Sequence, residues 1–180
     1  MNSNANPVAL ITGASGGIGR ALALRLKAQG CRVVAVGRDA DRLSNVVADL
    51  RVSADTTTPE GATAAVEACQ SALGAVPALL AHCVGSTLIA PLHRTRVEAC
   101  RDIIRVNLDS AVYMLHAWLA ALAGAPGAAV FVSSVVARVG VANHEAIAAA
   151  KGGVEALVRS AAATYRSEEH TSELQSLAYL

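Results

Sequence analysis

The chain has 180 residues, of which 53% are hydrophobic and 3% aromatic, and its formal net charge at pH 7 is +1. This length suits one domain with an aliphatic core. The near-neutral charge and the lack of a basic run exclude a phosphate-tracking nucleic-acid binder. Residues 1–7 lack the apolar core of a signal peptide, and no uncharged apolar run reaches membrane-spanning length, so we expect a cytoplasmic protein with no membrane partner.

Strand-like and helix-like segments alternate along the chain. Strands are expected from Val8 to the first glycine-rich loop and over residues 31–36, 50–54, 77–83 and 129–133. Helices are expected over residues 20–29, 40–49, 59–73, 96–106, 108–122 and 145–165. This alternation predicts an α/β fold, a Rossmann-type doubly wound parallel sheet with helices on both faces. A ligand is then expected at the carboxyl ends of the strands.

The loop Thr12-Gly13-Ala14-Ser15-Gly16-Gly17-Ile18-Gly19 joins the first strand to the first helix. Backbone N–H groups and the helix dipole at such a helix start attract an anion. Gly13 would allow the tight turn, Gly17 the close approach of a pyrophosphate, and Gly19 close packing of helix on strand. The loop therefore predicts a phosphate cradle, with an ordinary tight turn as the alternative. The cysteines and histidines show no ligand spacing, so no metal site is expected.

The glycine-rich loop and four further residues form one pattern of fixed order and spacing along the chain. The four are Asp55 after the third strand, Asn107 in Val106-Asn107-Leu108, Ser134 after Val132-Ser133, and Lys151 after three alanines. Over about residues 8–165 the chain resembles a short-chain dehydrogenase/reductase. The resemblance implies hydride transfer between NAD(P)(H) and a carbonyl or alcohol carbon of a small molecule. It implies a catalytic set of Ser134, Lys151 and Asn107, and a cofactor-binding set of Gly13, Ser15, Gly17, Ile18, Gly19, Arg38, Asp55, Gly85 and Lys151.

The resemblance also assigns a role to each of the four residues. Asp55 would meet the adenine amino group, and Asn107 would support the active-site helix and a water that relays protons. Ser134 would hydrogen-bond the substrate oxygen, and Lys151 would hold the nicotinamide ribose hydroxyls. The alternatives are a turn-capping Asp, a helix cap, a capping serine at the strand end and a solvated helix lysine.

Cofactor choice is read at the end of the second strand, where an acid suits a ribose 2′-OH and an arginine suits a 2′-phosphate. This chain has Arg38 there, with Asp39 one residue later. Because a guanidinium binds phosphate bidentately, NADP(H) is favoured over NAD(H). Alternatively, Arg38 is a solvated residue at a helix start and Asp39 a plain N-cap.

The chain departs from the family's pattern at the position of its catalytic tyrosine, four residues before Lys151. Ile147 stands there and cannot transfer a proton. The family's Asn-Asn-Ala-Gly after the fourth strand is altered to His82-Cys83-Val84-Gly85. His144, or a water that it holds, could supply the proton instead, because imidazole transfers protons at neutral pH. The alternative functions are an NAD(P)-binding protein without turnover and an inactive gene fragment.

Residues 166–176 interrupt the alanine-rich pattern with a polar, acidic string that resembles the translation of a sequencing-library adapter. We therefore expect residues 1–165 to be a truncated NAD(P)-binding domain and residues 166–180 a non-native tail, with a natural polar helix as the alternative. The fifth strand would then lie at an exposed sheet edge in a marginally stable chain. The family often pairs through its two long helices, here 108–122 and 145–165, so a homo-oligomer is expected for the parent protein.

Overall fold

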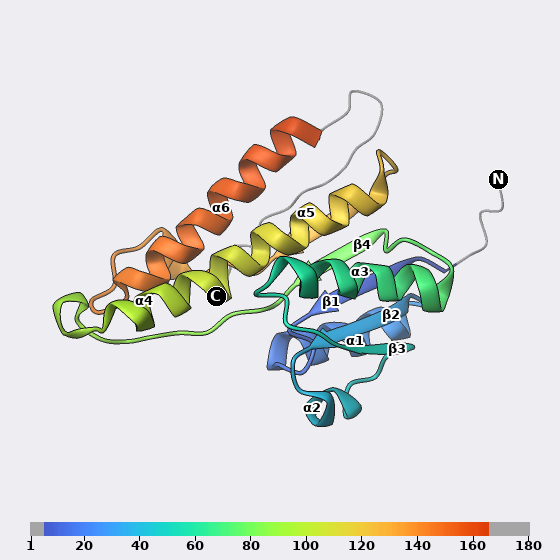
Figure 1. The fold of residues 1–180 in the computed structure, drawn as a ribbon, viewed down its shortest axis with the longest axis horizontal. Coiled ribbons are helices and arrows are strands. Elements are labelled where there is room, and N and C mark those ends of the chain that lie inside the picture. Colours follow the sequence, from blue (N-terminus) through green and yellow to red (C-terminus); the bar gives the residue numbers. More distant parts are fainter. Residues whose placement is uncertain (1–5, 166–180) are drawn as a thin grey trace.

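A computed structural model describes residues 6–165 of the chain. In this part the sheet has five parallel strands in the order β3-β2-β1-β4-β5 (Figure 1). The strands are β1 Val8–Thr12, β2 Arg32–Gly37, β3 Leu50–Ser53, β4 Leu79–His82 and β5 Ala128–Phe131. The predicted doubly wound α/β fold is confirmed. The tail expected to be non-native, residues 166–180, lies outside the described residues.

The helices follow the strands in the predicted alternation. They are α1 Gly17–Ala28, α2 Ala40–Ser44, α3 Pro59–Leu73, α4 Val97–Ile104, α5 Ser110–Leu122 and α6 Glu145–Tyr165. Within residues 6–165, no helix is both long and apolar enough to cross a membrane.

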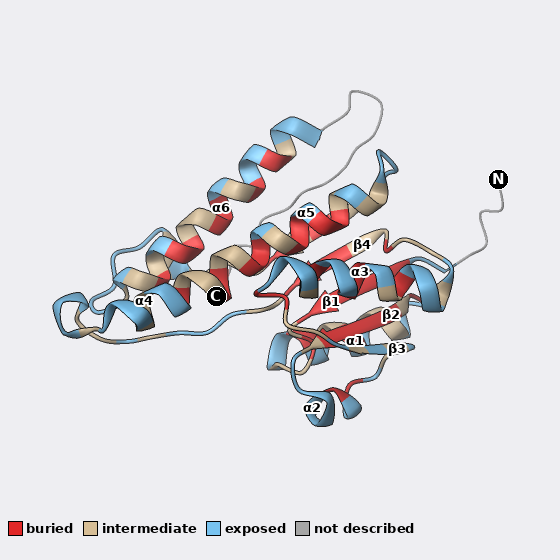
Figure 2. Cartoon of the chain, viewed as in Figure 1, coloured by how far each residue is buried: buried red, intermediate tan, exposed pale blue. Residues whose placement is uncertain are grey.

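Two hydrophobic cores cover the two faces of the sheet, because alternate strand residues point to opposite faces. One core joins strand residues such as Leu10 and Phe131 to α3, α5 and α6, and it includes the buried Trp118 of α5. The other joins Ile11 and the neighbouring strand residues to α1 and α2. The inner strands and the sheet-facing sides of α3 and α5 are accordingly buried (Figure 2).

The register of the sheet aligns the ends of its central strands. Thr12 pairs with Val36 on one side and with His82 on the other. The loops that follow β1, β2 and β4 therefore leave the sheet at one edge, which is where the sequence predicts the ligand.

Three predicted helix boundaries are wrong. The first helix begins at Gly17 instead of residue 20. The second helix ends at Ser44 instead of residue 49, because the chain turns to pair with β2: Asp49 donates its backbone N–H to Val33 O at 2.8 Å and accepts the Val33 N–H on its carboxylate at 2.6 Å. The expected break at residue 107 is a π-helical turn, Arg105–Asp109, that joins α4 to α5 without interruption.

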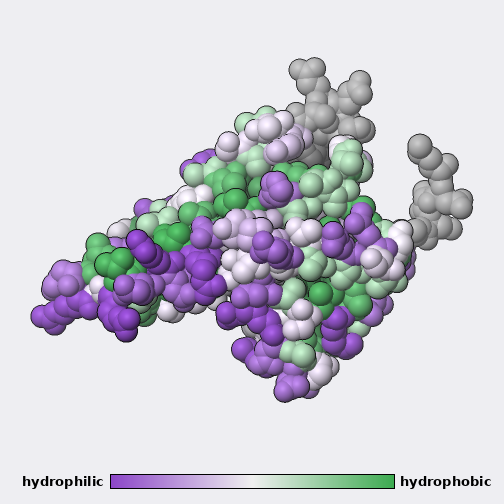
Figure 3. Space-filling model, in the orientation of Figure 1, coloured by the Kyte–Doolittle hydropathy of each residue, from purple (hydrophilic) through white to green (hydrophobic). Residues whose placement is uncertain are grey.

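The margins of the molecule also follow from this architecture. Among the described strands, β5 pairs only with β4, so it lies at the predicted sheet edge. On the face shown in Figure 3, hydrophobic residues gather over α5 and α6, whereas hydrophilic residues gather over α2 and the start of α4.

Candidate functional site

The glycine-rich loop makes a turn that larger residues could not make. Gly13 has φ +65°, and a Cβ there would lie 2.7 Å from the backbone carbonyl of Cys83 on β4's side of the turn. A Cβ on Gly19 would lie 2.5 Å from Gly13 O, whereas a Cβ on Gly17 would meet nothing within 4 Å. The N-cap residue Gly16 offers no side-chain acceptor, and no acid lies in the first turn of α1. The first N–H groups of α1 are thus open to an external anion.

A cavity of about 620 Å³ lies beside this loop at the carboxyl ends of the strands. Five predicted cofactor residues line it: Gly13, Ser15, Arg38, Asp55 and Gly85. Gly17 lines a smaller neighbouring hollow, Ile18 is 54% exposed, and Gly19 is buried under the turn. Ser134, Asn107 and Lys151 are not among the residues that line the larger cavity.

Two arginines line the cavity beyond β2. Arg38 follows the strand directly, and Arg42 lies one turn further along in α2. Asp39 caps α2 by accepting the Arg42 N–H at 3.0 Å, so its carboxylate already has a backbone partner. Arg38 and Arg42 thus bring two positive charges to this end of the cavity, beside Asp39, whose Oδ1 caps the helix.

Asp55 is held in the β3–α3 loop by Thr57. Its Oδ1 accepts the Thr57 backbone N–H at 3.1 Å and the Thr57 hydroxyl at 2.8 Å. Burial alone would raise the pKa of Asp55, but these hydrogen bonds and the charges of Arg38 and Arg105 hold that pKa below its ordinary value. Asp55 is thus an ionised acceptor in the cavity wall.

A buried histidine, His82, directly precedes the cavity residue Cys83 and joins β4 to β1 and α5. The Ser110 hydroxyl donates to Val106 O at 2.7 Å, so its oxygen accepts the Nε2–H of His82 at 3.1 Å. The unprotonated Nδ1 of His82 then accepts the Thr12 hydroxyl at 2.8 Å. Burial, reinforced by the charge of Lys151, lowers the pKa of His82 to about 3. This ring is a neutral structural link.

Lys151 and Asn107 meet where β4 and β5 end. Lys151 Nζ donates to Val132 O at 2.8 Å. A Cβ on Gly85 would lie 3.4 Å from Lys151 Nζ and 3.0 Å from Asn107 Oδ1, so a larger residue there would crowd the Asn107 side chain. Asn107 lies in the π turn, donates to Ile103 O at 2.9 Å and is not a helix cap. Burial lowers the pKa of Lys151 to about 8, and Lys151 is not a solvated helix lysine.

Ser134 begins the 3₁₀ turn that follows β5, and its Oγ accepts the Val136 N–H at 3.4 Å. The neighbouring segment is tied to α6 by Glu155, which lies one turn beyond Lys151. The Glu155 carboxylate accepts from Ser133 Oγ at 3.1 Å and from Arg138 Nε at 2.9 Å. Glu155 therefore links the strand end that carries Ser134 to the helix that carries Lys151.

Residue 147, at the position of the family's tyrosine, has apolar surroundings and is buried from solvent. Ile147 is 4% exposed and packs with Ile103 in a cluster that Leu88 and Val136 also contact. His144 precedes α6 and its Nδ1 lies 2.7 Å from Ala142 O. That hydrogen bond leaves Nε2 as the ring atom that can exchange a proton with another partner.

Fold and sequence together place the chain in a known class. The family model for short chain dehydrogenase matches residues 7–170. A short chain dehydrogenase from Bacillus anthracis shares the fold with a TM-score of 0.89 and 22% identity, covering 96% of this chain and 73% of that one. The chain belongs to the short-chain dehydrogenase/reductase family, whose members are NAD(P)-binding oxidoreductases.

Among its relatives are two bacterial enzymes named for alicyclic alcohols. It is 37% identical over 169 residues to cis-4-hydroxycyclohexanecarboxylate dehydrogenase of Sinomonas cyclohexanicum, covering 89% of this chain and 68% of that protein. It is 34% identical over 169 residues to cyclohexanol dehydrogenase of Acinetobacter sp. (strain SE19), covering 89% and 67%. An aldohexose dehydrogenase of Thermoplasma acidophilum has a TM-score of 0.82 and 25% identity, and the match covers 89% of this chain and 62% of that one.

Sequence reasoning missed several residues of the site. Arg42 had a signal, since it lies four residues after Arg38 at a helix start. The other contacts join residues that are far apart in sequence: His82 to Ser110, Arg105 to Thr57, and Glu155 to Ser133.

Proposed function

We propose that the cavity holds NADP(H) and that the parent protein is an oxidoreductase that interconverts an alcohol and a carbonyl compound. The observation that carries this proposal is the combined wall of the cavity, in which the turn of Gly13, the acceptor Asp55 and the narrow passage at Gly85 lie together. The uncapped start of α1 supports a pyrophosphate beside Gly16 and Gly17. The bound cofactor would supply or accept the hydride.

The preference for NADP(H) rests on the end of the cavity beyond β2. Arg38 and Arg42 would hold a 2′-phosphate, and one oxygen of the Asp39 carboxylate already caps the helix that carries Arg42. The test is titration of the chain with NADPH and with NADH, followed by nicotinamide fluorescence. Arg38→Ala and Arg42→Ala should each weaken NADPH binding about tenfold and leave NADH binding unchanged.

The control for these variants is Arg25→Ala, which removes the same charge from the last turn of α1. It should leave both affinities unchanged. Equal weakening of NADPH and NADH binding by Arg38→Ala would contradict a 2′-phosphate site.

In the proposed reaction the residues of this chain bind and orient. Lys151, with its pKa lowered to about 8, would hold the ribose hydroxyls and is itself held by Val132 O. Ser134 would donate its hydroxyl hydrogen to the substrate oxygen, where negative charge develops. Asn107 would keep the helix beside them in register through Ile103 O.

The proton would come from a group other than residue 147. We propose His144, or a water that it holds, because its Nε2 is unused in the described residues and it lies three residues before Ile147. His144→Ala in the full-length parent should abolish turnover and preserve NADPH affinity. Unchanged turnover would end this proposal.

The buried Ile147 favours a second candidate, a nucleotide-binding protein without turnover. The two candidates differ in one experiment with the full-length parent. A panel of carbonyl compounds is incubated with NADPH and the parent, with and without Ile147→Tyr. Turnover by the unmodified protein supports the enzyme, whereas turnover by Ile147→Tyr alone supports the silent binder.

We propose an alicyclic alcohol or ketone as the substrate class. The names of the two bacterial relatives support it, and so does the apolar cluster of Ile103, Ile147, Leu88 and Val136 at the site. Cyclohexanone should therefore be a better substrate than a charged sugar in the same panel.

We also propose that the parent is a homo-oligomer that pairs through α5 and α6. The hydrophobic residues over these helices in Figure 3 support this, and Val112 on α5 is 38% exposed. Sedimentation of the parent should give a dimer or tetramer, and Val112→Glu should shift it toward the monomer.

A further inference from the structure

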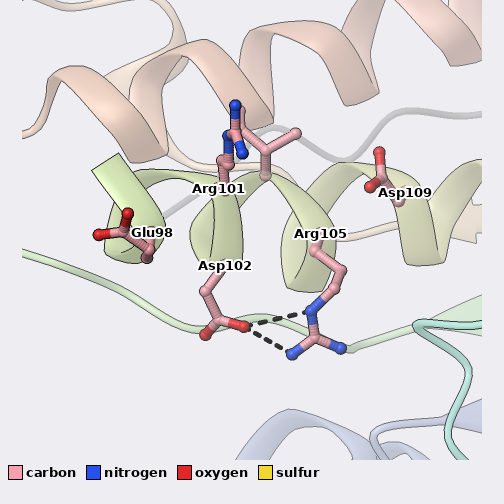
Figure 4. A pocket seen from close by; sticks show the side chains of 6 residues that line it. Glu98, Arg101, Asp102, Arg105 and Asp109 are labelled. Carbon is pink, nitrogen blue, oxygen red and sulfur yellow. Dashed lines mark hydrogen bonds and ion pairs between the residues drawn. The ribbon is translucent and has the colours of Figure 1, made fainter. Parts of the chain in front are cut away.

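The cavity wall that contains Asp55 is braced from outside by a residue that no part of the proposed function uses. Arg105 begins the π turn, and its Nη1 donates to the Thr57 hydroxyl oxygen. Its Nε and Nη2 donate to Asp102 Oδ1 at 3.2 and 2.5 Å (Figure 4). Thr57 and Asp102 therefore hold the guanidinium on two sides. The brace joins segments that lie 48 residues apart.

Thr57 passes the effect of Arg105 to Asp55. The hydroxyl of Thr57 has one hydrogen, which it donates to Asp55 Oδ1, while its oxygen accepts from Arg105. Thr57 is buried, so its hydroxyl has no alternative partner in solvent. A hydrogen bond from a cation to the hydroxyl oxygen polarises the O–H and strengthens the bond that it donates.

The geometry leaves the other carboxylate oxygen of Asp55 for a ligand. Oδ1 receives both hydrogen bonds from Thr57, and Oδ2 has no hydrogen-bond partner among residues 6–165. Asp55, Thr57 and Asp102 all line the larger cavity. Fixing Oδ1 therefore fixes the direction in which Oδ2 can accept.

We infer that Arg105 is a positioning residue that acts through Thr57 to orient the Asp55 carboxylate toward a hydrogen-bond donor on the base of a bound nucleotide. This inference rests on the proposed function, since it assumes that the cavity takes a dinucleotide. It adds that Arg105, at the start of the π turn, raises the affinity for the adenine half of that ligand through Thr57 and Asp55. The nicotinamide half lies outside the reach of Arg105.

The test compares the two halves of the cofactor on the full chain. Adenosine 2′,5′-bisphosphate and reduced nicotinamide mononucleotide are each titrated by calorimetry, with NADPH as the whole ligand. Arg105→Met should weaken binding of the bisphosphate and of NADPH about tenfold, the effect of losing one such bond at a charged acceptor. Binding of the mononucleotide should stay within about twofold of the unmodified chain.

Two further variants keep the test independent of any folding defect in Arg105→Met. Thr57→Val removes the relaying hydroxyl at nearly constant volume and should weaken bisphosphate binding as Arg105→Met does. Thr57→Ser retains a hydroxyl and should keep the bisphosphate affinity of the unmodified chain. Arg101→Met is the charge-matched control, because Arg101 points away from the Asp102–Arg105 pair in Figure 4. It should behave as the unmodified chain.

The outcomes separate the two levels of the argument. If Arg105→Met and Thr57→Val leave bisphosphate binding unchanged, or weaken both halves equally, the positioning role is overturned while NADP(H) binding stands. If the unmodified chain binds neither NADPH nor NADH, the proposed function is overturned and this inference with it.

Discussion

Burial of one side chain, His82, should make this protein less stable in acid. The ring is fully buried and neutral, and both of its nitrogens are engaged, with Thr12 and with Ser110. Its pKa is about 3 in the folded chain against an ordinary value of 6.5, so between these values the unfolded chain binds a proton that the folded chain does not. Stability contributed by His82 is present above pH 6.5 and is lost as pH falls toward 3.

The size of the effect follows from the two pKa values. Each pH unit between them costs about 1.4 kcal/mol, so at pH 5 the free energy of unfolding should be about 2 kcal/mol lower on account of His82. For a chain of this length that corresponds to a fall of roughly 4–8 °C in melting temperature.

The perturbation is His82→Asn, and the assay is thermal melting of the chain and the variant at pH 7 and pH 5. Asparagine can still donate and accept but cannot titrate, so whatever it costs in packing should be the same at both pH values. The melting temperature of the unmodified chain should fall more between the two pH values than that of the variant. Parallel falls would show that the folded chain accepts the proton without penalty and would refute the reasoning.

Three further predictions concern stability. Below pH 8, Lys151→Met should raise the free energy of unfolding by up to about 3 kcal/mol, because burial destabilises only the charged lysine. This difference should vanish as the pH rises through 10.5. A difference in chemical denaturation that does not change with pH would contradict this. Gly19→Ala should cost about 1–3 kcal/mol through its clash with Gly13 O, whereas Gly17→Ala should be neutral or slightly stabilising; equal melting temperatures would contradict the packing argument. Glu155→Ala should cost about 1–3 kcal/mol in urea unfolding, since Ser133 and Arg138 lose a buried acceptor, and a cost below about 0.5 kcal/mol would refute the linking role.

The sheet could be predicted because its signals are local. Strands β1, β2 and β4 are short, mainly apolar runs that end in glycine or a polar residue. The helix between residues 59 and 73 is marked in the sequence by Thr58 as a cap and Pro59 in its first turn. The end of α2 could not be predicted, because it depends on the pairing of Asp49 with Val33, which only the assembled sheet supplies.

The residues of the candidate site also differ in whether local sequence predicts them. The glycine loop, Arg38 and Asp55 are readable because a turn and two strand ends place them in the cavity wall. The environment of His82 is not readable, since its neutrality depends on burial and on partners in β1 and α5. The sequence shows His82 only as part of the altered segment after the fourth strand, whereas in the structure it is the buried last residue of β4.

The π turn at Arg105–Asp109 has a mechanical consequence. An i→i+5 turn holds more residues than an α-helical turn, so it rotates the face of whatever follows it. Ahead of it Ile103 packs beside Ile147, and beyond it Met114 and Trp118 pack against the sheet. The continuous helix formed by α4, the π turn and α5 therefore packs against Ile147 near the candidate site at one end and against the central sheet at the other, and Asn107 lies in the turn between them. Deleting one residue of the π turn would rotate the helix on one side of it, so that one of these two packed surfaces would face solvent.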